Sequence, residues 1–78
     1  QRRQEMAKIA GKYAEQARVS VRNVRRHCMD ELKQLERGGH LSEDDQKVYA
    51  DEVQEMTNKT ISEIDDAFAQ KQTDITQV

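Results

Sequence analysis

A pair of adjacent glycines, Gly38 and Gly39, is the only strong break in a sequence that otherwise keeps helical spacing along its whole length. The chain has 78 residues and no proline, and its third glycine, Gly11, lies inside a periodic stretch. A glycine inside a helix costs about 1 kcal/mol relative to alanine, which the neighbouring turns can offset. The sequence therefore predicts two long helices joined by one short turn.

The first half places apolar or small residues at steps of three or four, which is the spacing of one face of an α-helix. These positions are Met6, Ile9, Tyr13, Ala17, Val21, Val24, Cys28, Leu32 and Leu35. We expect a helix over about residues 2–37, followed by a glycine turn at 38–41.

The second half begins with Ser42, a good N-cap, and acidic residues at 43–45, where the helix dipole favours negative charge. A second helical stripe follows, at Tyr49, Val53, Met56, Thr60, Ile64, Phe68 (with Ala67) and Ile75. We expect this helix over about residues 43–76. Because the link is short, the two helices must lie antiparallel, and the predicted fold class is all-α, an antiparallel two-helix hairpin.

Both apolar stripes are thin, and only 35% of the residues are hydrophobic. Two helices alone leave one side of each stripe exposed, so we expect the hairpin to be part of a long three-helix bundle. The isolated chain should self-associate or be only marginally folded. No apolar run reaches the ~18 residues of a membrane span, and a single cysteine, Cys28, rules out an intramolecular disulfide. We expect a cytoplasmic protein with no membrane partner.

Charge is divided between the two halves. Residues 1–40 carry ten basic and five acidic side chains, a net charge of +5, whereas residues 41–78 carry three basic and ten acidic ones, a net charge of −7. The overall charge of −2 therefore hides a basic first helix and an acidic second one.

Four arginines, Arg18, Arg22, Arg25 and Arg26, lie within the ten residues "ARVSVRNVRR". At 100° per residue they fall within about 100° of each other, and the apolar stripe is centred about 250° from Arg18. We expect them to form a ridge that faces solvent, where the planar guanidinium can bind phosphate through two hydrogen bonds. The lack of interleaved aromatic residues favours folded RNA over unpaired bases. The alternative is a solvated face, partly neutralised by Glu15 and the acidic second helix.

No pattern of catalytic, cofactor-binding or metal-binding residues is present. His27 and His40 lack partners at metal-ligand spacing, and Cys28 lies on the apolar stripe as a small core residue would. We expect no enzyme activity, no cofactor and no metal.

Three stretches resemble the C-terminal part of the bacterial ribosome recycling factor family: "QRRQEMAKIAGKYAEQAR" at 1–18, "EQARVSVRNVRR" at 15–26 and "LSEDDQKVYADEVQEMTNKTISEID" at 41–65. The resemblance implies a long three-helix bundle domain, with a small α/β domain inserted between its first and second helices. Residues 1–78 would supply the second and third helices, and the first helix and the inserted domain would be absent.

The resemblance also implies a function. The family binds the large ribosomal subunit and its RNA and, with elongation factor G, promotes disassembly of the post-termination ribosome. The residues that match its RNA-binding motif are Arg22, Arg25 and Arg26, with Arg18 one turn earlier. GTP hydrolysis would belong to the elongation factor. Two alternatives are a structural hairpin that self-associates into a four-helix bundle, and a general nucleic-acid-binding helix.

Overall fold

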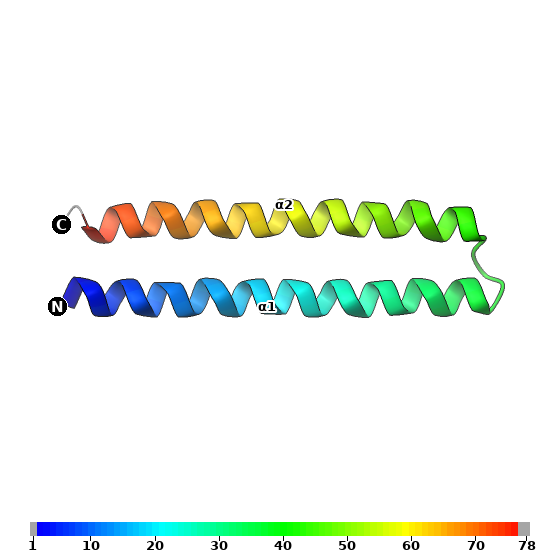
Figure 1. Cartoon of the computed structure of the whole chain (residues 1–78), viewed down its shortest axis with the longest axis horizontal. Helices are drawn as coiled ribbons and strands as arrows, with labels where there is room; N and C mark the ends of the chain where they lie inside the picture. The colour runs from blue at the N-terminus through cyan, green and yellow to red at the C-terminus, as the bar shows by residue number, and fades with distance from the viewer. Residues whose placement is uncertain (1, 77–78) are drawn as a thin grey trace.

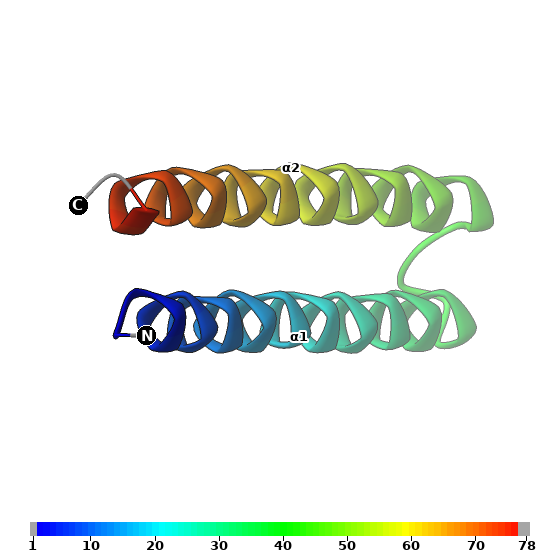
Figure 2. The same cartoon turned by 60° about the vertical axis from the view of Figure 1, so that its left-hand side comes forward.

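The computed structural model describes residues 2–76, which form two helices, α1 (Arg2–Arg37) and α2 (Glu43–Thr76). The helices run antiparallel side by side, so that the start of α1 and the end of α2 lie at the same end of the molecule (Figure 1). They remain side by side after rotation of the view by 60° (Figure 2). The predicted all-α hairpin is confirmed, and the helix bounds coincide with those expected from the sequence.

The molecule is a thin rod that measures 57 × 15 × 9 Å. Its radius of gyration of 17.6 Å is well above the roughly 11.5 Å of a compact domain with this many residues. A helix of this length is itself about 54 Å long, so the rod is as long as one helix.

The first helix ends in the manner that the glycine pair predicts. Gly39 has a φ of +77°, which L side chains rarely adopt. The His40 N–H donates to the Leu35 carbonyl at 2.8 Å, and the Gly39 N–H donates to the Glu36 carbonyl at 3.0 Å. These two bonds form a Schellman motif with Gly39 at its left-handed position.

The second helix begins at the predicted N-cap. The Ser42 hydroxyl oxygen accepts the Asp45 N–H at 3.0 Å, and the Ser42 carbonyl accepts the Gln46 N–H at 2.9 Å. Acidic residues occupy the first turn of α2, where they interact favourably with the helix dipole. The turn therefore satisfies backbone groups at the ends of both helices.

Burial between the helices is slight. Among the described residues, the only apolar side chains that are largely removed from solvent are Ala14 and Ile75, at 9% and 7% exposure. The polar residue Thr57 is equally buried, at 7%. Its hydroxyl donates to the Val53 carbonyl at 2.8 Å, so the burial leaves no unpaired hydroxyl.

Contact with α2 covers only one side of the predicted apolar stripe of α1. The less exposed α1 residues that define this contact side include Ala7, Ala10, Ala14, Ala17, Val21, Cys28 and Leu32. On a helical projection the centre of these seven residues is rotated by about 50° from the centre of the stripe, towards the arginines. The other side of the stripe stays exposed, with Tyr13 at 68% and Val24 at 63%. Neither helix, over the residues described, has an apolar segment long enough to cross a bilayer.

Candidate nucleic-acid interface

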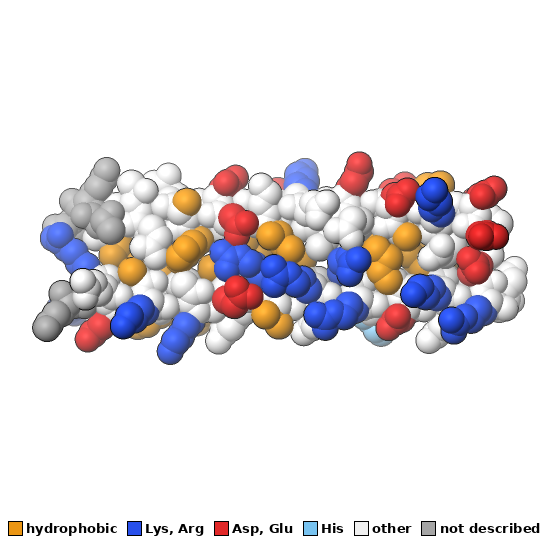
Figure 3. All heavy atoms as spheres, in the orientation of Figure 1, with side chains coloured by type: hydrophobic (Ala, Val, Ile, Leu, Met, Phe, Trp, Pro, Cys, Tyr) orange, Lys and Arg blue, Asp and Glu red, His pale blue; other side chains and the backbone are white. Residues whose placement is uncertain are grey.

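Arg18, Arg22, Arg25 and Arg26 lie in the middle of α1, and we call them the arginine face. On the side of the molecule drawn in Figure 3, basic side chains follow α1 and its boundary with α2, whereas acidic ones gather mainly on α2. The charge segregation read from the sequence is therefore also a segregation between the two helices.

Arg18 is bound to acidic groups on both helices. Its Nε–H donates to the Asp65 carboxylate of α2 at 2.7 Å, and its Nη1–H donates to Glu15 at 3.3 Å. The guanidinium also lies over the ring of Phe68, 5.9 Å from the ring centroid, where a cation–π attraction adds to the contact. The hydrogen bond to Asp65 is the main reason why the pKa of Arg18 is raised above its ordinary value, against a smaller effect of desolvation.

The predicted orientation of the arginines was wrong for Arg18 and Arg25. The Arg18 side chain is only 19% exposed, and Arg25 is half-buried and bonded to α2. The prediction placed the arginines relative to the centre of the apolar stripe and did not specify which side of the stripe α2 covers. Because α2 contacts the side of the stripe nearest the arginines, these two side chains lie at the boundary between the helices.

Arg22 is oriented as predicted and is 46% exposed. Its Nη1–H approaches Glu15 at 3.5 Å, the upper limit of a hydrogen bond. Glu15 therefore serves both Arg18 and Arg22, and its single negative charge compensates the two cations only in part. The neutralisation that the alternative interpretation proposed is present at this end of the arginine face.

Arg25 and Arg26 have uncharged partners. The Arg25 Nε–H donates to the Gln54 side-chain oxygen of α2 at 2.7 Å. The Arg26 Nη1–H donates to the Asn23 side-chain oxygen at 3.0 Å. An amide oxygen orders a guanidinium without cancelling its charge, so the positive charge of the face is concentrated at Arg25 and Arg26.

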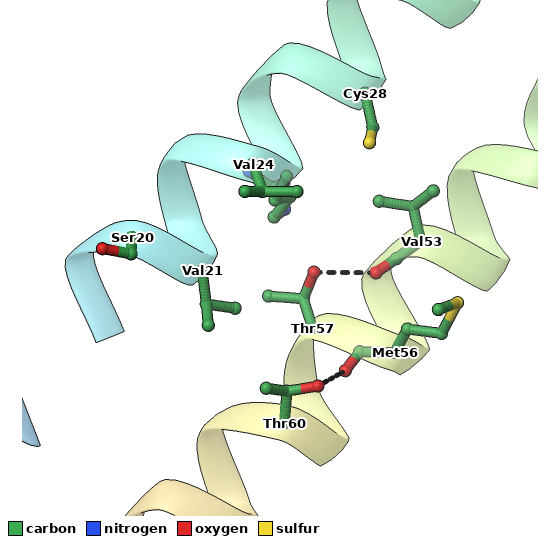
Figure 4. Close-up of a pocket in the computed structure, with 9 residues that line it drawn as sticks. Ser20, Val21, Val24, Cys28, Val53, Met56, Thr57 and Thr60 are labelled. Carbon is green, nitrogen blue, oxygen red and sulfur yellow. Dashed lines mark hydrogen bonds between the residues drawn. The ribbon is translucent and has the colours of Figure 1, made fainter. Parts of the chain in front are cut away.

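An apolar groove runs along the seam between the helices, and Figure 4 shows its central part. Its lining residues are Ser20, Val21, Val24, Arg25, Cys28, Val53, Met56, Thr57 and Thr60. Thr57 and Thr60 donate their hydroxyls to the carbonyls four residues earlier, both at 2.8 Å, so their polar groups are satisfied within α2. Leu35 and Tyr49 extend the apolar lining towards the turn.

The sequence interpretation missed the α2 partners Gln54 and Asp65. The hairpin itself contains the signal for Gln54, because Arg25 and Gln54 are 14 and 15 residues from Gly39 and must face each other in an antiparallel pair. The same symmetry brings Gly11 opposite Phe68. Asp65 is displaced from strict symmetry with Arg18, and only the length of the arginine side chain lets the two meet.

The histidines and the cysteine do not come together. His27 lies 3.1 Å from Glu31 on the exposed surface of α1, and Cys28 faces the groove as a free thiol. Over residues 2–76, no group of His, Cys, Asp and Glu side chains is arranged to hold a metal ion.

Fold and site together define a class of protein: an antiparallel helical hairpin with one cationic edge and an apolar groove between its two helices. The family model described as "Ribosome recycling factor" matches residues 1–76. The chain belongs to the ribosome recycling factor family.

Curated relatives match the chain over all 78 residues. The ribosome-recycling factor of Parvibaculum lavamentivorans is 58% identical, that of Rhodospirillum centenum 59% and that of Roseobacter denitrificans 55%. The chain spans about two fifths of the length of these relatives, 41–42% of each. The family membership does not support the alternative of a structural hairpin that acts by self-association.

Proposed function

We propose that this chain supplies the second and third helices of the three-helix bundle domain of a ribosome recycling factor. The relatives are more than twice as long as the chain, so they contain segments that could complete the bundle. The apolar groove supports a first helix as the missing element, because it is continuous and lined by aliphatic side chains and threonine methyl groups. The inserted α/β domain would come from the same additional length.

Within that factor, the arginine face binds RNA of the large ribosomal subunit, with Arg22, Arg25 and Arg26 as the contacting residues. The observation that carries this proposal is that, within residues 2–76, Arg25 and Arg26 are bonded to amide oxygens and to no acidic group. Among the described residues, no hydrogen bond uses Nη1 or Nη2 of Arg25, and that edge can bind a phosphate through two N–H groups. Arg18 is assigned to holding the helices together instead.

The factor acts with elongation factor G in the cytoplasm to disassemble the post-termination ribosome. GTP hydrolysis takes place on the elongation factor, and this chain contributes binding and shape rather than catalysis.

The test uses a chimera in which this chain replaces the matching segment of the Parvibaculum lavamentivorans factor. Binding of the chimera to purified large subunits is measured at three salt concentrations. Arg25→Ala should weaken binding about tenfold to a hundredfold, since a hydrogen bond to a charged group is worth about 1.5–3 kcal/mol. It should also flatten the dependence of log affinity on log salt by somewhat less than about one unit.

Two further variants make the result specific. Arg2→Ala removes the same charge about 35 Å away along α1 and on the opposite side of the helix, and should bind like the chimera. Arg25→Lys keeps the charge but loses the planar fork, so it should restore the salt dependence more than the affinity. The circular dichroism of each variant confirms that the helices are intact.

The proposal fails if the chimera does not bind large subunits while the parent relative does, or if Arg25→Ala binds as the chimera does. Equal affinity for duplex DNA and ribosomal RNA would instead indicate a general nucleic-acid-binding helix.

A further inference from the structure

Gln54 of α2 lies opposite Arg25 of α1, and both the oxygen and the nitrogen of its side-chain amide form hydrogen bonds. Its Oε1 accepts the Arg25 Nε–H at 2.7 Å, and its Nε2–H donates to the Asn58 side-chain oxygen at 2.9 Å. These bonds connect α1 to α2 and then continue one turn along α2.

The chemistry of arginine fixes the direction of this chain of bonds. A guanidinium has only donors, so Gln54 must present its oxygen to Arg25 and turn its NH₂ group the other way. Asn58 provides the acceptor for that NH₂ group. Gln54 is half-buried, which further limits the conformations of its side chain.

The consequence for Arg25 is orientation without loss of charge. Its Nε edge is occupied by a neutral acceptor, and the Nη1 and Nη2 groups remain for an external ligand. Arg18 shows the contrasting arrangement, because its Nε–H meets the Asp65 carboxylate and its Nη1–H meets Glu15. Arg18 and Arg25 thus both bond across the helices through Nε–H, but the charge of Arg18 is compensated by carboxylates and that of Arg25 is not.

We propose that Gln54 is a positioning residue for RNA binding: it holds the Arg25 guanidinium in the orientation in which Nη1 and Nη2 bind a phosphate. This inference rests on the RNA-binding function proposed above. An arginine that is ordered before it meets its ligand loses less conformational freedom on binding. Gln54 itself does not touch the RNA.

Gln54→Met in the chimera removes both hydrogen bonds of the Gln54 side-chain amide. It keeps the length of the side chain and its helix propensity. Large-subunit affinity should fall about three- to tenfold, because the Arg25 side chain, no longer held by Gln54, loses more conformational freedom on binding. The salt dependence should stay unchanged, because no charge is lost. Gln70→Met is the matched control, since Gln70 also donates to a residue one turn later, Asp74, but among the described residues it has no hydrogen bond to an arginine.

The double variant Arg25→Ala/Gln54→Met separates positioning from a general structural role. If Gln54 acts through Arg25, the double variant binds no more weakly than Arg25→Ala alone. A further loss in the double variant, or a Gln54→Met variant that binds like the chimera, overturns the positioning role while the proposed function stands. If Arg25→Ala itself binds normally, the proposed function fails and this inference fails with it.

Gln54→Glu tests the same contact if the methionine variant is poorly folded. A carboxylate still accepts the Arg25 Nε–H, but it cancels the charge of Arg25. We therefore expect weaker binding together with a flatter salt dependence, as for the loss of about one phosphate contact. Gln54→Glu binding with unchanged affinity and salt dependence would contradict the contact.

Discussion

Arg18 and Arg25 both extend from α1 to α2, and they differ in the α2 group to which they are hydrogen-bonded. Asp65 and Glu15 leave Arg18 with little net charge to offer a ligand, whereas Gln54 leaves Arg25 fully cationic. The sequence identified both arginines but not this difference. Which group each arginine meets depends on how far α1 is rotated about its own axis. A thin apolar stripe flanked by the small residues Ala7, Ala10 and Ala14 does not fix that rotation.

Arg18→Ala should therefore affect stability more than binding. It removes a hydrogen bond to α2, an ion pair within α1 and the contact with the ring of Phe68. We expect the Tm of the chimera to fall more for Arg18→Ala than for Arg22→Ala, and the loss of large-subunit affinity to show the reverse order. Thermal melts followed by circular dichroism, beside the binding assay, measure both. Arg18→Ala with an unchanged melt and the larger affinity loss would reverse the assignment of Arg18.

Gly11 is a helix-interior glycine that the packing does not require. A methyl group added there would lie 3.8 Å from the nearest ring atoms of Phe68, an ordinary van der Waals contact. Gly11→Ala should raise the free energy of unfolding of the chimera by about 1 kcal/mol through helix propensity alone. Urea denaturation checks it, and destabilisation would show that the helices approach each other more closely at this point than the structure has them.

At the scale of the helices, the ends are the best-specified part of the sequence. Gly39 adopts a positive φ, and the Ser42 side chain accepts a hydrogen bond from a backbone N–H group. Few other residues can do either. The positions of Gly39 and Ser42 set the end of α1 and the start of α2, and hence which residues of the two helices face each other. The lateral packing was less predictable, because the apolar stripes do not determine which of their sides lie against each other.

Removing either helix end signal should destabilise the hairpin. Ser42→Ala loses the bond to the Asp45 N–H and should lower the free energy of unfolding of the chimera by about 1 kcal/mol. Gly39→Ala forces an alanine into the left-handed region and should cost about 1–2 kcal/mol. Ser62→Ala, at an exposed position inside α2, is the control and should have almost no effect. Equal melts for Ser42→Ala and Ser62→Ala would mean that the cap does not stabilise α2.

For the molecule as a whole, the surface that remains exposed is the dominant fact. Its accessible area is 6277 Å², against roughly 4,900 Å² for a compact protein of this mass. Met56 and Tyr13 are each 68% exposed although both lie on predicted apolar stripes. The sequence anticipated this shortage of burial from the thin stripes. It could not show that part of this exposed apolar surface, including Met56, forms a groove between the helices, since that depends on the relative rotation of both helices.

The isolated chain should consequently be marginally folded, while the chimera, in which a first helix can cover the groove, should unfold cooperatively. We expect a broad, low-temperature loss of helical signal for the isolated chain, because a helix pair with so little burial gains little stability in water. Sedimentation at several concentrations shows whether the isolated chain is monomeric in these melts. A monomeric isolated chain with a sharp thermal transition would contradict the incomplete-bundle interpretation.

Met56→Asp connects this behaviour to the groove. In the isolated chain the side chain is in contact with water, so the substitution should leave the melt almost unchanged. In the chimera the new carboxylate would be buried against the first helix without a partner, and the free energy of unfolding should fall by about 3 kcal/mol or more. Ser62→Asp adds the same charge at an exposed position of α2 and should be tolerated in both proteins. If Met56→Asp leaves the melt of the chimera unchanged, the groove stays open to water in the whole factor, and the first helix must pack on another side of the hairpin.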